Sequence, residues 1–203
     1  QQAIDLGVQH HKAGRLPEAE NVYQQILQSN PDQPVALHLL GVIAHQVGKN
    51  DVAVDLITKA LAIKPDYAEA HNNLGNVLKE LVRMDEALAH YHKAIAIKPD
   101  YAEAHNNLGI ALQELRRPDE AIDYYRNAIA IKPDPAEAHN NLDIALQELS
   151  RPDEATNYYR NAIEIKPDYA VAHSNLGTAL QELVQLAEAV VHYQKAIAIK
   201  PDY

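Results

Sequence analysis

The sequence lacks cysteine, tryptophan and phenylalanine, and its single methionine is Met84. Without cysteine there can be no disulfide framework, thiolate zinc site or cysteine nucleophile. No run of about 18 apolar residues is present, and no basic-then-apolar start indicates a secretory signal. We therefore expect no membrane partner and a cytoplasmic location. The chain begins with Gln1 rather than methionine, which favours a fragment or a processed form.

Basic residues are also scarce. The chain has 18 lysines and arginines against 28 aspartates and glutamates, which gives a formal charge of −10. Proteins that bind nucleic acid without sequence preference need a basic face to displace counterions from phosphate. We therefore expect no nucleic-acid partner.

The aromatic residues are of one kind, because all eleven are tyrosine. Burial alone does not favour tyrosine over the other aromatic residues. The skew indicates that one short pattern has been copied several times, and the position of each tyrosine supports this. Five share one repeated position, namely Tyr23, Tyr91, Tyr125, Tyr159 and Tyr193, and four others follow Pro-Asp, namely Tyr67, Tyr101, Tyr169 and Tyr203.

A repeat of constant length runs through the whole chain. Pro-Asp recurs at one fixed interval, at Pro31, Pro65, Pro99, Pro133, Pro167 and Pro201. Residues 99–132 and 133–166 are identical at 28 of 34 positions. We therefore predict a single array over residues 1–203, with repeats at about 1–33, 34–67, 68–101, 102–135, 136–169 and 170–203.

Each repeat has the periodicity of two amphipathic helices. In the fourth repeat one apolar stripe consists of Ala104, Leu108, Ala111, Leu112 and Leu115, and a second consists of Ala121, Ile122, Tyr125, Ala128 and Ile129. Arg116 to Pro118 predict a short turn between them, with proline at the first position of the second helix. One hairpin cannot bury both stripes alone, so neighbouring hairpins must stack into an all-α solenoid.

Acidic pairs near each repeat start predict capping boxes for the first helices. These pairs are Asp66 with Glu69, Asp100 with Glu103, and Asp134 with Glu137. Pro133 is expected to end the preceding helix.

The spacing of these residues resembles that of the tetratricopeptide repeat family. The third repeat has the family's pattern as Leu74, Gly75, Ala87, Tyr91, Ala94 and Pro99. The resemblance implies a right-handed α-solenoid of six helix–turn–helix repeats that binds proteins. The fifth repeat departs from it, because Asp143 replaces the small residue at which the paired helices approach. We expect this acid to splay its hairpin or turn toward solvent, with Ala155 as its neighbour.

The histidines do not predict a metal site. His71, His105, His139 and His173 recur once per repeat, where the family usually has tryptophan. Equivalent atoms of neighbouring repeats should lie about 8–10 Å apart, too far for shared coordination, so we expect these side chains to pack in the core. No glycine-rich phosphate loop and no Gly-x-Ser-x-Gly motif is present. We predict no catalytic residues, no cofactor and no metal.

A row of asparagines is the candidate binding site. Asn73, Asn107, Asn141 and Asn175 each precede a leucine on the first helix of a repeat. A primary amide offers a donor and an acceptor together, so such a row can pair with the backbone of an extended peptide. It is similar to the asparagine ladder of O-linked N-acetylglucosamine transferases. The alternative is that recent duplication copied ordinary solvated residues.

The leading hypothesis is a non-catalytic scaffold that binds an extended polypeptide in the groove formed by the first helices. Glu69, Glu103 and Glu137 favour polar or basic segments, and the lysines and arginines of a carboxylate clamp are not in place. A second hypothesis is self-assembly by end-to-end stacking, because the last helix, Ala187 to Ile199, should expose an apolar face. A third, from the resemblance, is a substrate-recruiting domain of a larger glycosyltransferase-like enzyme.

Overall fold

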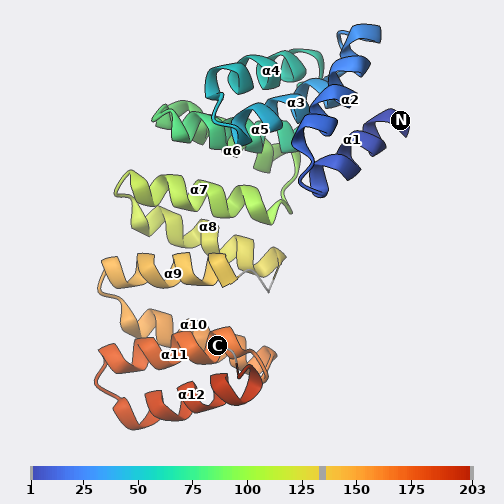
Figure 1. The fold of residues 1–203 in the computed structure, drawn as a ribbon. Coiled ribbons are helices and arrows are strands. Elements are labelled where there is room, and N and C mark those ends of the chain that lie inside the picture. The colour runs from blue at the N-terminus through green and yellow to red at the C-terminus, as the bar shows by residue number, and fades with distance from the viewer. Residues whose placement is uncertain (1, 133–135, 202–203) are drawn as a thin grey trace. The chain divides into compact units, whose positions relative to one another are not determined.

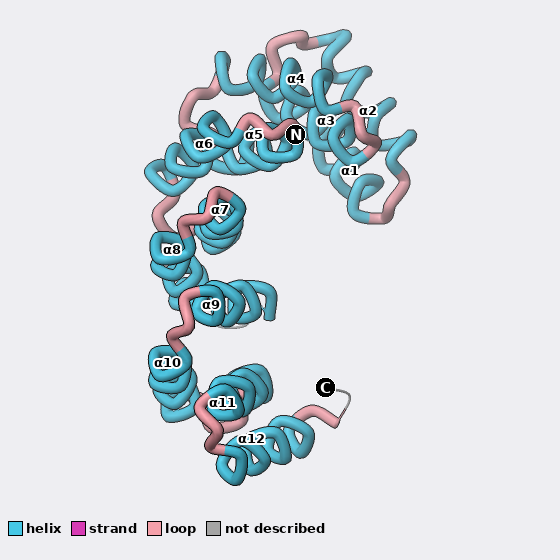
Figure 2. The backbone as a smooth tube through the Cα atoms, turned by 90° about the vertical axis from the view of Figure 1, so that its left-hand side faces the viewer, coloured by secondary structure: helices cyan, strands magenta, loops and turns pink. Residues whose placement is uncertain are grey.

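A computed structural model describes residues 2–132 and 136–201 of the chain. Within these residues the helices are the only regular elements, and no strand occurs (Figure 1, Figure 2). They are α1 (Gln2–Lys12), α2 (Leu16–Ser29), α3 (Pro34–Gln46), α4 (Asn50–Ile63), α5 (Ala68–Glu80), α6 (Met84–Ile97), α7 (Ala102–Glu114), α8 (Pro118–Ile131), α9 (Ala136–Glu148), α10 (Pro152–Ile165), α11 (Ala170–Glu182) and α12 (Leu186–Ile199). No helix of the described residues is both long and apolar enough to cross a membrane.

The helices follow the period of the sequence. The odd-numbered helices are the first helices of six hairpins, and the even-numbered helices are the second helices. From α3 onward the first helices begin at residues 34, 68, 102, 136 and 170, so each start follows the previous one by one repeat length. The predicted all-α solenoid of helix–turn–helix repeats is confirmed.

The hairpins form two compact units, Gln1–Asn107 and Leu108–Tyr203, and the division falls inside α7. In the N-terminal unit α3 packs on α4 and α5 packs on α6, while α4 also packs on α5. In the C-terminal unit α8 packs on α9, α10 packs on α11 and α11 packs on α12. Within each unit a second helix therefore covers the first helix of the hairpin that follows.

Both apolar stripes predicted for the fourth repeat face the core. On α7 the buried residues include Ala104, Leu108, Ala111 and Leu112, and on α8 they are Ala121, Ile122, Tyr125, Ala128 and Ile129. Leu115 is half-buried. The second-helix tyrosines Tyr23, Tyr91, Tyr125 and Tyr159 are fully buried, which makes them the largest side chains of the core.

Glycine is required where a first helix meets the tyrosine of its partner. A Cβ atom added to Gly75 would lie 2.6 Å from Cε1 of Tyr91, and one added to Gly109 would lie 2.5 Å from Cε1 of Tyr125. Carbon atoms cannot approach so closely, so a side chain at this position must move the tyrosine or the helix.

The fifth hairpin carries such a side chain, Asp143, and it is open. Helices α9 and α10 approach each other less closely than α3 and α4, α5 and α6, or α11 and α12 (Figure 1). Asp143 is half-buried, and its neighbour is Tyr159, whose hydroxyl hydrogen-bonds its carboxyl group. The expected splaying is present. The contact with Tyr159 was not expected, and the contact with Ala155 stays a prediction. The tyrosine packs at this point in four of the other hairpins, so it is the group that meets the acid.

The capping boxes predicted for the first helices are also wrong where the structure describes them. The N-cap of α5 is Tyr67 rather than Asp66, and no side chain caps it. Asp66 therefore lies one residue too early, and Glu69 is one residue short of the position that a capping box needs. Pro133, Asp134, Pro135 and Tyr203 lie outside the described residues.

Each hairpin turn contains one residue with a left-handed backbone. These residues are Gly14, Gly48, Val82, Arg116, Ser150 and Val184, spaced one repeat length apart, with φ between 52° and 76°. Glycine adopts this conformation without steric cost, whereas for a β-branched residue it is strained. The turn geometry is therefore kept in all six hairpins, although only the first two have glycine there.

Candidate functional site

The four ladder asparagines all lie on first helices. Asn73 is on α5 and Asn107 on α7, in the N-terminal unit, while Asn141 is on α9 and Asn175 on α11, in the C-terminal unit. The first three are half-buried, and Asn175 is 7% exposed. Each precedes a buried leucine, so the helix places it at the edge of its buried face.

In the N-terminal unit the ladder amides link consecutive first helices. Nδ2 of Asn107 donates a hydrogen bond to Oδ1 of Asn72 over 3.0 Å. Nδ2 of Asn73 lies 2.8 Å from Nε2 of His38, and an amide nitrogen can only donate. Nδ1 of His38 therefore carries the ring proton, and it lies 2.9 Å from the hydroxyl of Tyr67. Burial lowers the pKa of His38 to about 4, so its ring is neutral at neutral pH.

Other polar side chains brace the same surface. Nδ2 of the buried Asn72 donates to Oε1 of Glu103 over 3.1 Å. The hydroxyl of Tyr91 donates to Oδ1 of Asn76 over 2.8 Å. These contacts hold the amides in fixed orientations, which lowers the entropy that a ligand must overcome on binding.

In the C-terminal unit the ladder contacts the open hairpin. Nδ2 of Asn175 donates to the hydroxyl of Tyr159 over 3.2 Å. This hydroxyl also lies 3.2 Å from the backbone oxygen of His139, and it hydrogen-bonds Asp143. Burial raises the pKa of Asp143 to about 7, and the charge of Glu182 adds to the rise against the bond from Tyr159. The fold therefore favours the protonated form of Asp143 far more than solvent does.

The first helices carry a strong excess of negative charge. Helices α5, α7, α9 and α11 contain seven glutamates, one aspartate and one lysine, Lys79. The glutamates are exposed, namely Glu69, Glu80, Glu103, Glu114, Glu137, Glu148 and Glu182. Negative charge on each of these helices attracts basic segments and repels acidic ones.

The histidines at the repeat starts are buried, as predicted, and most have the same partner. Nε2 of His71 and of His105 lies 3.0 Å from the backbone oxygen of Pro65 and of Pro99, and His173 repeats the contact at 2.9 Å. His139 instead contacts the hydroxyl of Tyr169. No cluster of three or more metal-ligating side chains occurs within the described residues. These histidines tie the start of a first helix to the loop before it.

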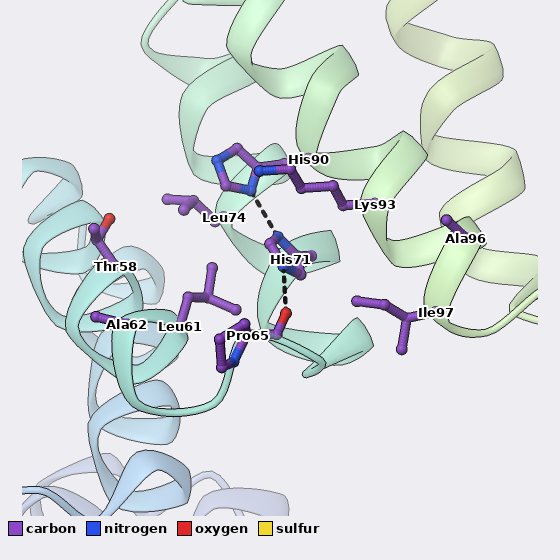
Figure 3. Close-up of a pocket in the computed structure, with 10 residues that line it drawn as sticks. All are labelled: Thr58, Leu61, Ala62, Pro65, His71, Leu74, His90, Lys93, Ala96 and Ile97. Atoms are coloured by element: carbon purple, nitrogen blue, oxygen red, sulfur yellow. Dashed lines mark hydrogen bonds between the residues drawn. The ribbon is translucent and has the colours of Figure 1, made fainter.

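His71 also forms the floor of a groove of about 540 Å³ in the N-terminal unit (Figure 3). Its Nδ1 lies 2.9 Å from Nδ1 of His90. Because Nε2 of His71 donates to Pro65, its Nδ1 is the acceptor and His90 is the donor. Burial, together with the nearby His71 and Lys93, lowers the pKa of His90 to about 4 against the charge of Glu86. Both rings of the His71–His90 pair are therefore neutral at neutral pH, and the pair contributes to packing.

Sequence reasoning missed the bonds that hold the ladder in place. Asn107 with Asn72 and Asn73 with His38 are both 35 residues apart, one more than the repeat period. That offset could have been found by searching for polar residues one period plus one position apart. The contact between Tyr159 and Asp143 had a signal too, because the tyrosine follows the glycine at the same spacing in four other repeats.

The regular hairpins and their glycine–tyrosine contacts invite comparison with known proteins. Models described as tetratricopeptide repeat match residues 10–74, 66–134, 100–168 and 170–203. Comparison with curated proteins gives no match.

Several solved structures share the fold. YrrB, described as a TPR protein with an unusual peptide-binding site, is 23% identical with a TM-score of 0.64, over 89% of this chain and 93% of that chain. TTC0263 of Thermus thermophilus, a thermophilic TPR protein, is 25% identical with a TM-score of 0.65, over 94% and 98%. PilF of Pseudomonas aeruginosa is 19% identical with a TM-score of 0.76, over 100% and 92%.

One of the matching models alone spans residues 66–168, about half of the chain. The helical hairpins at regular intervals, with glycine against tyrosine in four of them, agree with this match. The chain belongs to the tetratricopeptide repeat family.

Proposed function

We propose that the chain is a non-catalytic scaffold that binds an extended polypeptide on its first-helix surface, through Asn73, Asn107, Asn141 and Asn175. The tetratricopeptide fold supports a protein-interaction scaffold. The observation that carries the finer proposal is the set of ladder amides, one in each of the last four repeats. Asn73, Asn107 and Asn175 are oriented by hydrogen bonds within the protein, and Asn141 also interacts within it. The amide groups are then oriented before the ligand binds.

The amides have capacity for a ligand beyond their bonds within the protein. A primary amide has two N–H donors and one carbonyl oxygen, and the bonds of Asn73, Asn107 and Asn175 each use one N–H. A peptide unit presents one N–H and one carbonyl group, which match the remaining groups of a side-chain amide. Pairing through the backbone makes few demands on the sequence of the ligand. The glutamates nearby favour ligands with lysine or arginine.

YrrB is described as having an unusual peptide-binding site, and it shares the fold at 23% identity. That description concerns YrrB alone. It supports the proposal only as an example of a peptide bound by this architecture.

A titration with peptides selected from a displayed library tests the proposal. The test variant replaces all four ladder asparagines with alanine. The control replaces two exposed amides of second helices, Asn157 and Gln194, with alanine. We expect the ladder variant to lose at least about tenfold in affinity, or about 1.4 kcal/mol, and the control to bind normally. Equal affinity of the two, with both folded by circular dichroism, would remove the ladder from the mechanism.

A second proposal is self-association through the outermost helices. Val190 and Ile197 of α12 are 51% and 54% exposed, whereas the equivalent Ile122 and Ile129 of α8 are 2% and 7% exposed under α9. Leu6 of α1 is 48% exposed. Inside the array, the equivalent faces of neighbouring hairpins pack against each other. The exposed face of α12 in one copy can pack in the same way on the exposed face of α1 in a second copy.

Light scattering at increasing concentration tests this second proposal. We expect the mean mass to rise with concentration in the wild type and to stay at 22.5 kDa in a Val190→Lys, Ile197→Lys double variant. A wild type that stays monomeric at the highest concentrations would exclude it.

A further inference from the structure

A second groove of about 600 Å³ lies in the C-terminal unit, between second helices α8 and α10. These helices lie on the same side of α9 (Figure 2). Arg126 and Ile129 of α8 form one wall and Tyr158 and Ile165 of α10 the other, and His139 of α9 also lines the groove. This volume is in the range of sites that take a bulky side chain or a small ligand. The groove contains none of the ladder asparagines.

The open fifth hairpin exposes an unusual amount of apolar surface in this groove. Ile165 is 87% exposed, whereas its equivalents Ile63, Ile97, Ile131 and Ile199 are 37% to 43% exposed. The fourth and fifth repeats are nearly identical, and Asp143 is the substitution between them that lies where α9 meets its partner helix. We attribute the exposure of Ile165 to this opening.

The chemistry of the lining is distinct from that of the rest of the molecule. The described lining includes two cations, Arg126 and Lys166, and no carboxylate, although the chain has 28 acidic residues. Outside the groove lining, Arg126 pairs with two carboxylates, those of Glu154 and Asp123. The Nζ atom of Lys166 lies 5.0 Å from the ring centre of Tyr169. The rest of the lining is aliphatic, aromatic or amide. An apolar floor beside cations matches an apolar group attached to an anion.

We propose that this groove binds a partner-protein segment in which a bulky apolar side chain stands next to an acidic residue. The apolar side chain covers Ile165 and Ile129, and the acidic residue pairs with Lys166. Charge complementarity sets this partner apart from the ligand of the first helices, because that surface favours basic segments. The scaffold thus has two surfaces of opposite preference.

A fluorescent anion, 8-anilinonaphthalene-1-sulfonate, is a first probe because it joins an aromatic ring system to a negative charge. We expect saturable binding at one site in the full chain. Ile165→Glu places a carboxylate in the groove and should weaken binding at least about tenfold. The control, Ile63→Glu, makes the same change at the equivalent position three repeats earlier, outside the groove, and should leave binding unchanged. Equal binding by both variants would overturn the proposal.

Asp143→Gly is the decisive variant, since it should let α9 and α10 close and cover Ile165. We expect it to lose the probe site while its melting temperature rises, so unfolding cannot explain the loss. The fourfold asparagine-to-alanine variant of the ladder should keep the site. If Asp143→Gly retained full binding, the groove opened by Asp143 would not be the site.

The partner chemistry is tested with a displayed peptide library, selected on the wild type and depleted on Asp143→Gly. We expect the enriched peptides to carry an aromatic or large aliphatic residue beside aspartate or glutamate, and to displace the probe. Enrichment of basic peptides, or of peptides that do not compete with the probe, would contradict the proposed partner.

Discussion

The hydroxyl of Tyr159 lies 3.2 Å from the backbone oxygen of His139, one helical turn before Asp143. In the third hairpin the equivalent hydroxyl, of Tyr91, reaches Asn76, one residue after the glycine. A side chain in place of glycine has therefore moved the tyrosine hydroxyl toward the start of the first helix. This displacement, the open hairpin and the exposed Ile165 are three aspects of one substitution.

We expect Asp143→Gly to stabilise the chain by about 1–3 kcal/mol at pH 8, because it removes a half-buried carboxylate and restores close packing. Glycine costs about 1 kcal/mol in helix propensity. The measured change in stability is therefore the gain in packing minus this cost. Thermal unfolding measures it. An unchanged or lower melting temperature at pH 8 would contradict the interpretation.

The same substitution has a pH signature. The pKa of Asp143 is about 7 in the fold against 3.8 ordinarily, so the fold favours its protonated form. The contribution of protonated Asp143 to the free energy of unfolding is fully present below pH 3.8. It is lost as the pH rises through 7, by at most about 1.4 kcal/mol per pH unit. The advantage of Asp143→Gly should therefore shrink between pH 8 and pH 5. Asp143→Asn, which cannot ionise, serves as the control and should abolish this dependence.

Two histidines give the N-terminal unit the opposite dependence. Burial lowers the pKa of His38 and His90 from 6.5 to about 4, against Glu69 near His38 and Glu86 near His90, while His71 and Lys93 also face His90. The contribution of these neutral rings to the free energy of unfolding is present above pH 6.5 and is lost as the pH falls toward 4.

Hydrogen exchange followed by mass spectrometry tests both units at once. We expect α3, α5 and α6 to lose protection between pH 6.5 and 4.5, after correction for the intrinsic exchange rate, while α9 and α10 keep theirs. His90→Gln, which stays neutral, should reduce the loss in α6. Parallel loss in both units would contradict the assignment.

Left-handed turns offer a third change. Val82 and Val184 are 81% and 76% exposed, so their side chains contribute little packing. Replacing either with glycine should relieve backbone strain of about 1 kcal/mol. Urea unfolding should show higher midpoints for Val82→Gly and Val184→Gly. The reverse change, Gly48→Val, should lower the midpoint by a similar amount, and three unchanged midpoints would argue that the turns carry no strain.

Thr156 is a fourth site of instability. Its side chain is 3% exposed, and its Oγ1 has no hydrogen-bond partner in the described part of the chain. The equivalent residue of the previous repeat is Ile122, which is buried in the same place on α8. Thr156→Ile should therefore stabilise the fifth repeat by about 1–3 kcal/mol. A calorimetric scan measures the gain, and Thr178→Ile at a half-buried threonine with a hydroxyl partner is the control.

The hairpins could be predicted from sequence because two independent patterns agree. The stripes around Leu108 and Tyr125 have the helical period, and the turns recur at the repeat period. The capping boxes failed because the helix start depends on tertiary contacts as well as on local preference. His71 binds the carbonyl group of Pro65, and Tyr67 contacts His38 of the preceding hairpin, which together fix where α5 begins.

The candidate site was predicted less completely. The positions of Asn73 and Asn107 on the first helices follow from periodicity, but their bonds to His38 and Asn72 depend on how neighbouring helices are offset. The groove beside Ile165 could not be seen in the sequence at all, since it arises from a change in packing around Tyr159. A single residue alters the distance between two helices, and no local pattern records that distance.

The opposed titrations of Asp143 and of His38 with His90 have a mechanical consequence. When the array is stretched, the unit with the lower unfolding barrier yields first. At alkaline pH the charged carboxylate weakens the C-terminal unit, and in mild acid the protonating histidines weaken the N-terminal one. The order in which the two halves extend under load should therefore reverse with pH, and proton concentration would decide which end of the scaffold gives way.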